Sequence, residues 1–297
     1  MSDDQSQATP VLTPGQAGLA ECRPVPGVAK PDPIFTADGV VRSFGGLVAV
    51  DVDHLEIQRG TITSLIGPNG AGKSTFFNVV SGFDAPTRGS WTFEGEDISK
   101  LPAHKVARRG MVRTFQLTKA LTRLTAHENL MLGATDQRGE RFLPALLRFP
   151  WREQEAAIGE RADELLERFN LAHMRDEFAG TMSGGQRKLL EMARALMVEP
   201  SMLMLDEPMA GVNPALTQSL LGHIQALRDE GMTIVLVEHD MDVVMGISDW
   251  VTTFAQGKLI AEGCPDDIRR NEAVIEAYLG AHRSLPRDAE EKEKRDE

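Results

Sequence analysis

Nine residues between positions 67 and 75, GPNGAGKST, have the composition and spacing of a loop that binds a phosphate group. They follow the apolar run TITSLI and precede FFNVVSG, so a strand should lead into the loop and a helix should begin at its end. Lys73 can then reach the β- and γ-phosphates of a nucleotide, and the Ser74 hydroxyl can ligate Mg²⁺. The pattern predicts a Walker A loop formed by Gly67, Pro68, Asn69, Gly70, Ala71, Gly72, Lys73, Ser74 and Thr75.

Two later apolar runs end in polar side chains that could act on that phosphate. MLMLDEP delivers Asp206 and Glu207 at the carboxyl end of a strand, where ligands gather in open α/β sheets. Asp206 is the expected Mg²⁺ partner, and Glu207 can polarise the attacking water or accept its proton. LVEHD places His239 at a third strand end, where it could donate to the γ-phosphate. Alone, an acidic pair is often a solvated strand cap and a single histidine is more often structural, so both roles depend on the Walker A loop.

A glutamine and a second glycine-rich helix start complete the set. Gln116, in RTFQ, ends a strand-like segment where a helical region begins, and it could couple Mg²⁺ and water geometry to movement of that region. The run TMSGGQRKLLEMARALM opens a strongly patterned helix with Ser183, Gly184 and Gly185. Helix starts attract anions because their first N–H groups have no partner within the helix. Since the Walker A loop already provides for one phosphate, the second start raises the question of whose phosphate it contacts.

Apolar patterning predicts the elements that must position these residues. Residues 34–60 alternate apolar and polar positions, as short antiparallel strands do. TITSLIG, SMLMLDE and MTIVLVEH are nearly all apolar, which is typical of strands buried on both faces of a parallel sheet. SLLGHIQALRDEG predicts a helix that ends at Gly231. We therefore expect a layered α/β fold.

The region from about 117 to 180 has helical periodicity without a buried-strand run, which predicts a helical insert in the α/β body. Within it, ERFLPALLRFPWREQ contains two prolines that should break it into short helices or a hairpin. Its apolar side chains need cover, either within the insert or against a partner. They are Leu143, Leu146, Leu147, Phe149 and Trp151.

Bulk properties exclude several classes of function. The chain has 297 residues, a net charge of −12 and no run rich in Lys and Arg, which disfavours binding to nucleic acid. Cys22 and Cys264 lack the spacing of a metal site or redox pair. Residues 1–33 are expected to be a disordered extension and 286–297 a solvated charged tail. The sequence contains no window of eighteen apolar residues, so it predicts no membrane-spanning helix.

Taken in order, the Walker A loop, Gln116, MSGGQ, LDEP and His239 resemble the ATP-binding cassette (ABC) ATPases, over roughly residues 34–281. The resemblance implies a P-loop NTPase fold with a RecA-like core, an antiparallel β subdomain and an inserted α-helical subdomain at about 117–185, within an ATPase domain spanning 34–285. It implies ATP and Mg²⁺ as ligands. The metal would be held by Ser74, Gln116 and Asp206, and hydrolysis would use Lys73, Gln116, Glu207 and His239. Phe44, in RSFGG, would stack on adenine, with core packing as the alternative.

In that family two ATPase subunits pair head to tail. The resemblance therefore implies that Ser183, Gly184, Gly185 and Gln186 of one chain close on the γ-phosphate held by Lys73 of another. The partner would be a second ABC ATPase subunit, identical or different. In MAGVNP, Asn213 stands where many members have an aspartate, which leaves the charge at that interface position open.

RSFGGLVAV, AGVNP, VEHDMDVVMGISD and VIEAYLG look like the ATP-binding subunits of branched-chain amino acid importers. This implies a peripheral subunit at the cytoplasmic face of the inner membrane that energises separate permease subunits, with a solute-binding protein as an indirect partner. The permeases would dock near LTKALTRLTAHENL, at a groove between the core and the helical insert. Urea or amide import and lipopolysaccharide export share much of the pattern. A soluble ABC ATPase without a transport role, such as an iron–sulfur assembly factor, is the alternative from another class.

Overall fold

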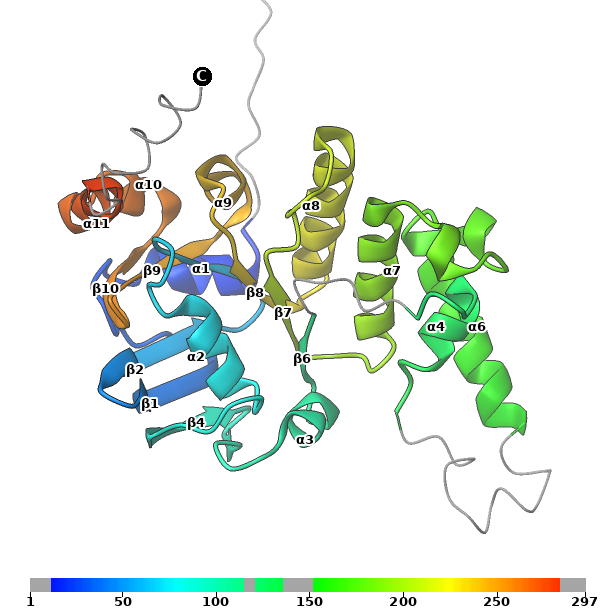
Figure 1. The fold of residues 1–297 in the computed structure, drawn as a ribbon, viewed down its shortest axis with the longest axis horizontal. Helices are drawn as coiled ribbons and strands as arrows, with labels where there is room; N and C mark the ends of the chain where they lie inside the picture. Colours follow the sequence, from blue (N-terminus) through cyan, green and yellow to red (C-terminus); the bar gives the residue numbers. More distant parts are fainter. Residues whose placement is uncertain (1–11, 115–120, 136–151, 284–297) are drawn as a thin grey trace, which may run out of the picture.

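A six-stranded sheet lies at the centre of the computed structural model, which describes residues 12–114, 121–135 and 152–283 (Figure 1). The strand order is β10-β9-β3-β8-β7-β6, with β10 antiparallel to β9 and the remaining neighbours parallel. In chain order the strands are β3 (Ile62–Ile66), β6 (Met111–Arg113), β7 (Met202–Asp206), β8 (Thr233–Val237), β9 (Trp250–Ala255) and β10 (Lys258–Gly263). Every residue of β3, β7 and β8 is buried, which confirms the three apolar runs as inner strands.

A second, antiparallel sheet has the order β2-β1-β4-β5. Its strands are β1 (Pro33–Phe44), β2 (Leu47–Gln58), β4 (Arg88–Phe93) and β5 (Glu96–Asp97). The alternating region predicted as short strands is therefore one long hairpin, because β1 and β2 are each 12 residues long and pair along most of their length. A bulge between Arg42 and Ser43 adjusts the register near its turn.

The central sheet separates two apolar cores. On one face, α2 (Lys73–Val80) and the antiparallel sheet pack on Met202 and Met204 of β7. On the other face, α7 (Gly184–Leu196) and α8 (Pro214–Asp229) pack on Leu203 and Leu205. Alternate residues of one strand thus serve opposite cores, which is why that strand has no polar face. The expected α/β layering is confirmed.

Helices dominate the part of the chain between β6 and β7, as the periodicity predicted. They are α4 (Ala126–Met131), α6 (Arg152–Arg168), the 3₁₀ turns η2 (Ala172–Met174) and η3 (Ala179–Thr181), and α7. Leu130, Leu165 and Phe169 bring α4 and α6 into the same core as α7. The apolar residues predicted to need cover, between 143 and 151, lie outside the described residues, and the boundaries of the insert stay a prediction.

Residues 12–32 correct the expectation of a disordered extension up to residue 33. They form α1 (Pro14–Ala20), which begins with a capping box in which Thr13 and Gln16 exchange side-chain and backbone hydrogen bonds. The Gln16 amide also donates to the Asp249 carboxylate at 2.7 Å. Further on, Lys30 is buried against Glu262, with 3.2 Å between Nζ and Oε1. Composition alone suggested disorder, but these distant contacts stabilise the segment.

The remaining helices are α3 (Ala103–Arg108), α9 (Met241–Ile247), α10 (Pro265–Arg269) and α11 (Glu272–Arg283). Val244 of α9, Ile268 of α10 and Val274 of α11 form a small third core with Ile66 of β3, so the C-terminal helices lie under the strand that leads into the Walker A loop. Within the described ranges, no helix combines the length and the apolar character needed to cross a membrane.

Candidate nucleotide site

The Walker A loop joins β3 to α2, as predicted, and its glycines are needed for its shape. Gly72 is the residue before α2 and has φ +102°, a left-handed conformation that favours glycine. A Cβ atom there would lie 2.5 Å from the Ala49 carbonyl oxygen, and one at Gly67 would lie 2.2 Å from that of Phe254. The loop therefore packs against β2 and β9 so closely that the backbone itself forms the lining of the site.

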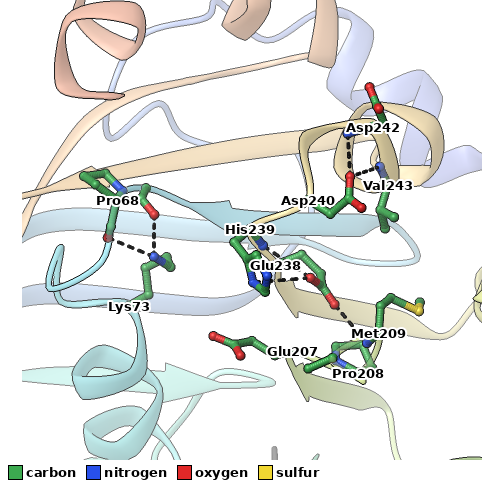
Figure 2. A network of polar contacts seen from close by, with 12 residues as sticks. Pro68, Lys73, Glu207, Pro208, Met209, Glu238, His239, Asp240, Asp242 and Val243 are labelled. Carbon is green, nitrogen blue, oxygen red and sulfur yellow. Dashed lines mark hydrogen bonds and ion pairs between the residues drawn. The ribbon is translucent and has the colours of Figure 1, made fainter. Parts of the chain in front are cut away.

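Lys73 is the first residue of α2 and folds back over this loop (Figure 2). Its ammonium group donates to the carbonyl oxygens of Gly67 at 2.5 Å and Pro68 at 3.1 Å. Burial lowers the pKa of Lys73, while the charges of Glu207 and Asp206 act in the opposite direction. The two carboxylates are thus close enough to influence the lysine electrostatically, which brings the three residues that the sequence predicted into one site.

Asp206 ends β7 and is held by Arg113 of the neighbouring strand β6. The guanidinium Nη2 lies 2.6 Å from Asp206 Oδ2, and both side chains are 7% exposed. Arg113 also donates to the Asn78 side-chain oxygen of α2 at 2.7 Å. The sequence analysis quoted Arg113 only as part of RTFQ and missed this role. The guanidinium ties the carboxylate to the helix that begins at the Walker A loop.

Glu207 and His239 follow the ends of the adjacent strands β7 and β8. Figure 2 shows Glu207 on the side of the Walker A loop and His239 above it, next to Glu238. The His239 side chain is 61% exposed, so it is not a packed core histidine. Its backbone N–H donates to the Glu238 carboxylate at 3.2 Å. Both residues lie just beyond the carboxyl ends of their strands, at the edge of the sheet that carries the Walker A loop.

The second glycine-rich helix start forms a capping box at the beginning of α7. The Ser183 hydroxyl accepts the Gln186 N–H at 3.2 Å, and the Gln186 side chain accepts the Ser183 N–H at 2.9 Å. In Figure 1, α7 and α2 lie on opposite sides of β7 and β8, and the two helices pack on opposite faces of the central sheet. Gln116 lies outside the described residues.

Comparison with known proteins decides the family. Residues 50–210 match the model of the ABC transporter family, and residues 258–283 match that of the branched-chain amino acid ATP-binding cassette transporter. This chain belongs to the ABC transporter ATPases. Members of this family bind and hydrolyse ATP, and so does this ABC ATPase. The resemblance drawn from its motifs is confirmed. The expected P-loop NTPase fold is confirmed as well.

Individual relatives agree with the family match. The ABC ATPase is 44% identical over 250 residues to the high-affinity branched-chain amino acid transport ATP-binding protein BraF of Pseudomonas aeruginosa, covering 84% of this chain and 98% of the relative. It is 41% identical to LivG of Escherichia coli K12, a protein of the same description, with the same coverage. Among solved structures, the ADP conformation of MJ1267, an ATP-binding cassette of an ABC transporter, matches with a TM-score of 0.73 and 36% identity over 84% of this chain and 99% of that one.

Phe44 and Asn213 both lie on the surface of the ABC ATPase. Phe44 ends β1, is 49% exposed and has the Arg42 guanidinium 4.3 Å from its ring centre, so core packing does not account for it. An exposed aromatic ring can stack on a planar base, so the adenine role stays a proposal. Asn213 is the N-cap of α8, because its side-chain oxygen accepts the Leu216 N–H at 3.0 Å.

Tyr278 of α11 is a second residue that the sequence analysis missed in the ABC ATPase. Its hydroxyl oxygen accepts the Gly67 N–H at 3.0 Å, at the first residue of the Walker A loop. Burial raises the pKa of the Tyr278 phenol, so the hydroxyl is neutral at physiological pH. The family segment 258–283 thus reaches the phosphate loop through one side chain. The motif VIEAYLG contains Tyr278, but only the fold shows that this side chain contacts Gly67.

Tyr278→Phe should weaken ATP binding while leaving the fold intact. The change removes one hydrogen bond and leaves the Gly67 N–H without its acceptor. A typical net value of about 0.5–1.5 kcal/mol corresponds to roughly a 2- to 12-fold increase in Kd. Titration with a fluorescent ATP analogue measures it. Leu279→Ala, at a 61% exposed position of the same helix, is the matched control and should bind as the unchanged protein does. Equal affinities of both variants would contradict a role for the hydroxyl.

Gly184 and Gly185, the first two residues of α7, should respond oppositely to alanine. A Cβ atom at Gly185 would lie 1.4 Å from Leu216 Cδ2, whereas one at Gly184 would meet nothing within 4 Å. Gly185→Ala is therefore expected to destabilise the fold by about 1–3 kcal/mol through overpacking. Gly184→Ala should leave stability unchanged or raise it by about 0.5–1 kcal/mol, because alanine favours helices.

If Gly184 serves a nucleotide on another subunit, Gly184→Ala should nevertheless lower ATP turnover by roughly 10-fold or more. Thermal unfolding and phosphate release, measured on the same preparations, separate the two effects. Full activity of Gly184→Ala would show that the open space at this position has no role in hydrolysis.

Proposed function

We propose that this ABC ATPase is the ATP-hydrolysing subunit of an importer of branched-chain or related amino acids. The observation that carries the proposal is the match of residues 258–283 to the branched-chain amino acid cassette model, because this segment lies outside the motifs that all ABC ATPases need. The names of BraF and LivG support the same cargo. The subunit would act at the cytoplasmic face of the inner membrane, bound to separate permeases.

A groove between the α/β core and the helical region is the proposed permease site. It has a volume of about 440 Å³ and lies between α3, α7 and the segments on either side of α4. Leu121 and Leu132 line it and are 46% and 59% exposed, and Arg108 and Arg194 add positive charge. Apolar side chains beside fixed charges suit a short helical segment of a partner. The groove adjoins the part of LTKALTRLTAHENL that the structure describes.

We further propose that two such subunits pair head to tail, each completing the other's site. The support is geometric, since Ser183 and Gly184 are exposed at the start of α7, and α7 packs on the face of the central sheet opposite to α2. Helix N–H groups and a small hydroxyl would then contact a γ-phosphate held by the partner subunit. A solute-binding protein would act on the permeases rather than on this chain.

Mg²⁺ is the proposed cofactor, and the residues present fit it. Asp206 supplies a carboxylate and Ser74 a hydroxyl near the first turn of α2, and oxygen ligands with substrate phosphates are what Mg²⁺ prefers. Gln116 is proposed as a further ligand. When bound, the ion supplies positive charge that offsets the negative charge developing on the phosphoryl oxygens. Glu207 would activate the water, and His239 would hold it against the γ-phosphate.

Reconstitution tests the proposed cargo. The ATPase would be combined in vesicles with its candidate permeases and binding protein, and uptake of radiolabelled leucine, isoleucine and valine would be compared with uptake of urea. ATP-dependent uptake of the amino acids supports the proposal. Uptake of urea alone, or hydrolysis that never depends on a permease, would assign the chain to another cargo or to a role outside transport.

A further inference from the structure

The loop after β7 holds Glu207 in a backbone conformation that side chains rarely adopt. Glu207 has φ +48°, in the left-handed region, and its N–H donates to the Val237 carbonyl oxygen of β8 at 2.9 Å. For a residue other than glycine such a conformation costs on the order of 1–3 kcal/mol and persists only where its surroundings enforce it. The groups that hold this loop are therefore part of how the carboxylate is aimed.

Lys188 of α7 holds the loop by donating hydrogen bonds to the backbone carbonyl groups of the loop. The ammonium donates to the carbonyl oxygens of Pro208 at 2.7 Å and Ala210 at 2.6 Å, with that of Glu207 at 3.4 Å. One lysine therefore contacts three carbonyl groups of a single turn. Partial burial lowers the pKa of Lys188, and nearby carboxylates, Glu238 first among them, favour its charged form.

Glu238, which follows β8, holds the same loop by accepting a hydrogen bond from its backbone. Its side chain is 1% exposed, and its two oxygens accept the Met209 N–H at 3.0 Å and the His239 N–H at 3.2 Å. Figure 2 shows the carboxylate between these two backbone groups. A single buried side chain thus joins the loop that carries Glu207 to the residue predicted to contact the γ-phosphate.

We propose that Lys188 and Glu238 are positioning residues for ATP hydrolysis, which fix residues 207–210 from two sides and so aim the Glu207 carboxylate. The inference rests on the proposed role of Glu207. Lys188 lies on the same helix as Ser183, five residues further on. When the start of α7 contacts the nucleotide of a partner subunit, the same rigid helix adjusts the catalytic loop of its own chain. Lys188 is thus a direct mechanical link between the two ATP sites.

Two substitutions in the full-length chain test this. Lys188→Met keeps the length of the side chain without its donors, and Glu238→Gln keeps the shape but turns an acceptor into a donor facing an N–H. Each should lower kcat by about 10- to 100-fold, since small misplacement of a reacting group has effects of that size. The Kd for ATP should change less than about 3-fold, because the Walker A loop is untouched. Lys188→Arg should retain most of the activity.

The double variant separates positioning from independent damage. If both residues act on one loop, Lys188→Met with Glu238→Gln should be about as slow as the slower single variant, and not slower by the product of both effects. Amide exchange at Met209 should be faster in Glu238→Gln. Lys100→Met and Glu230→Gln, at exposed positions outside these loops, are matched controls and should have wild-type kcat.

Wild-type kcat in Lys188→Met, with Glu207→Gln inactive, would overturn the inference and leave the role of Glu207 in place. The inference would also be overturned if the double variant lowered kcat by the full product of the two single effects. Activity retained in Glu207→Gln would instead refute the underlying assignment. If Glu238→Gln fails to fold, Lys188→Met decides alone, because its partly exposed side chain can be replaced without emptying the core.

Discussion

Glu207→Gln is expected to lower ATP turnover by at least about 100-fold, the usual contribution of a general base. The substitution keeps the shape of the side chain and removes its ability to accept a proton. Lys73 and the Walker A backbone remain, so ATP should still bind with Kd within about 3-fold of the original. Because hydrolysis would no longer separate the subunits, ATP should trap a dimer. Phosphate release, nucleotide titration and gel filtration with Mg²⁺-ATP measure these three outcomes.

The matched control for this variant is Glu230→Gln. Glu230 pairs with Arg168 at the surface, and its side chain is 58% exposed, so the same chemical change should leave turnover unaffected. Hydrolysis at the original rate in Glu207→Gln would remove this residue from the role assigned to it. Loss of ATP binding would indicate that the substitution acts on the fold of the loop rather than on the water.

Ser183→Arg should abolish hydrolysis while the isolated subunit still binds ATP. The exposed start of α7 would carry a long side chain into the space that the nucleotide of the partner subunit is proposed to occupy. The lesion therefore lies at the other subunit's site, and the Walker A loop of the same chain is intact. Turnover should fall by at least about 100-fold, comparable to the loss of a donor to a developing negative charge. ATP-dependent dimer formation should be lost with it.

Ser183→Arg also removes a helix cap, which costs about 0.5–2 kcal/mol, so the cap needs its own control. Thr13 forms the same kind of capping box at the start of α1, outside the motifs assigned to the nucleotide site. Thr13→Arg should show a similar loss of thermal stability with normal hydrolysis. A collapse of ATP affinity in monomeric Ser183→Arg would contradict a role in trans.

The parts of the site that could be predicted are those encoded by local pattern. The three apolar runs became β3, β7 and β8 because burial on both faces leaves no place for polar residues. Parallel strands align their carboxyl ends, so the Walker A loop, Asp206 and Glu207 were expected to lie near one another, and both carboxylates act electrostatically on Lys73.

The groups that were missed act between segments distant in the sequence. Arg113 and Asp206 are 93 positions apart, and Gly67 and Tyr278 are 211 apart. The topology of the fold brings the two residues of each pair together. The sequence around each residue contains no spacing pattern that identifies its partner. The helix α1 was missed for a related reason. Its Pro- and Gly-rich composition suggests disorder, although the capping box at Thr13 and Gln16 was present in the sequence.

The buried ion pair between Lys30 and Glu262 has a consequence for anyone shortening this protein. A chain cut back to the first strand, at residue 33, would look like a minimal ATPase and would lack Lys30. The Glu262 side chain, with no exposed surface, would then be left in the interior without its cation. Removing one member of such a pair typically costs about 3–5 kcal/mol, a large share of the stability of most domains. Affinity tags and fusion partners therefore belong ahead of residue 12, where this anchor is preserved.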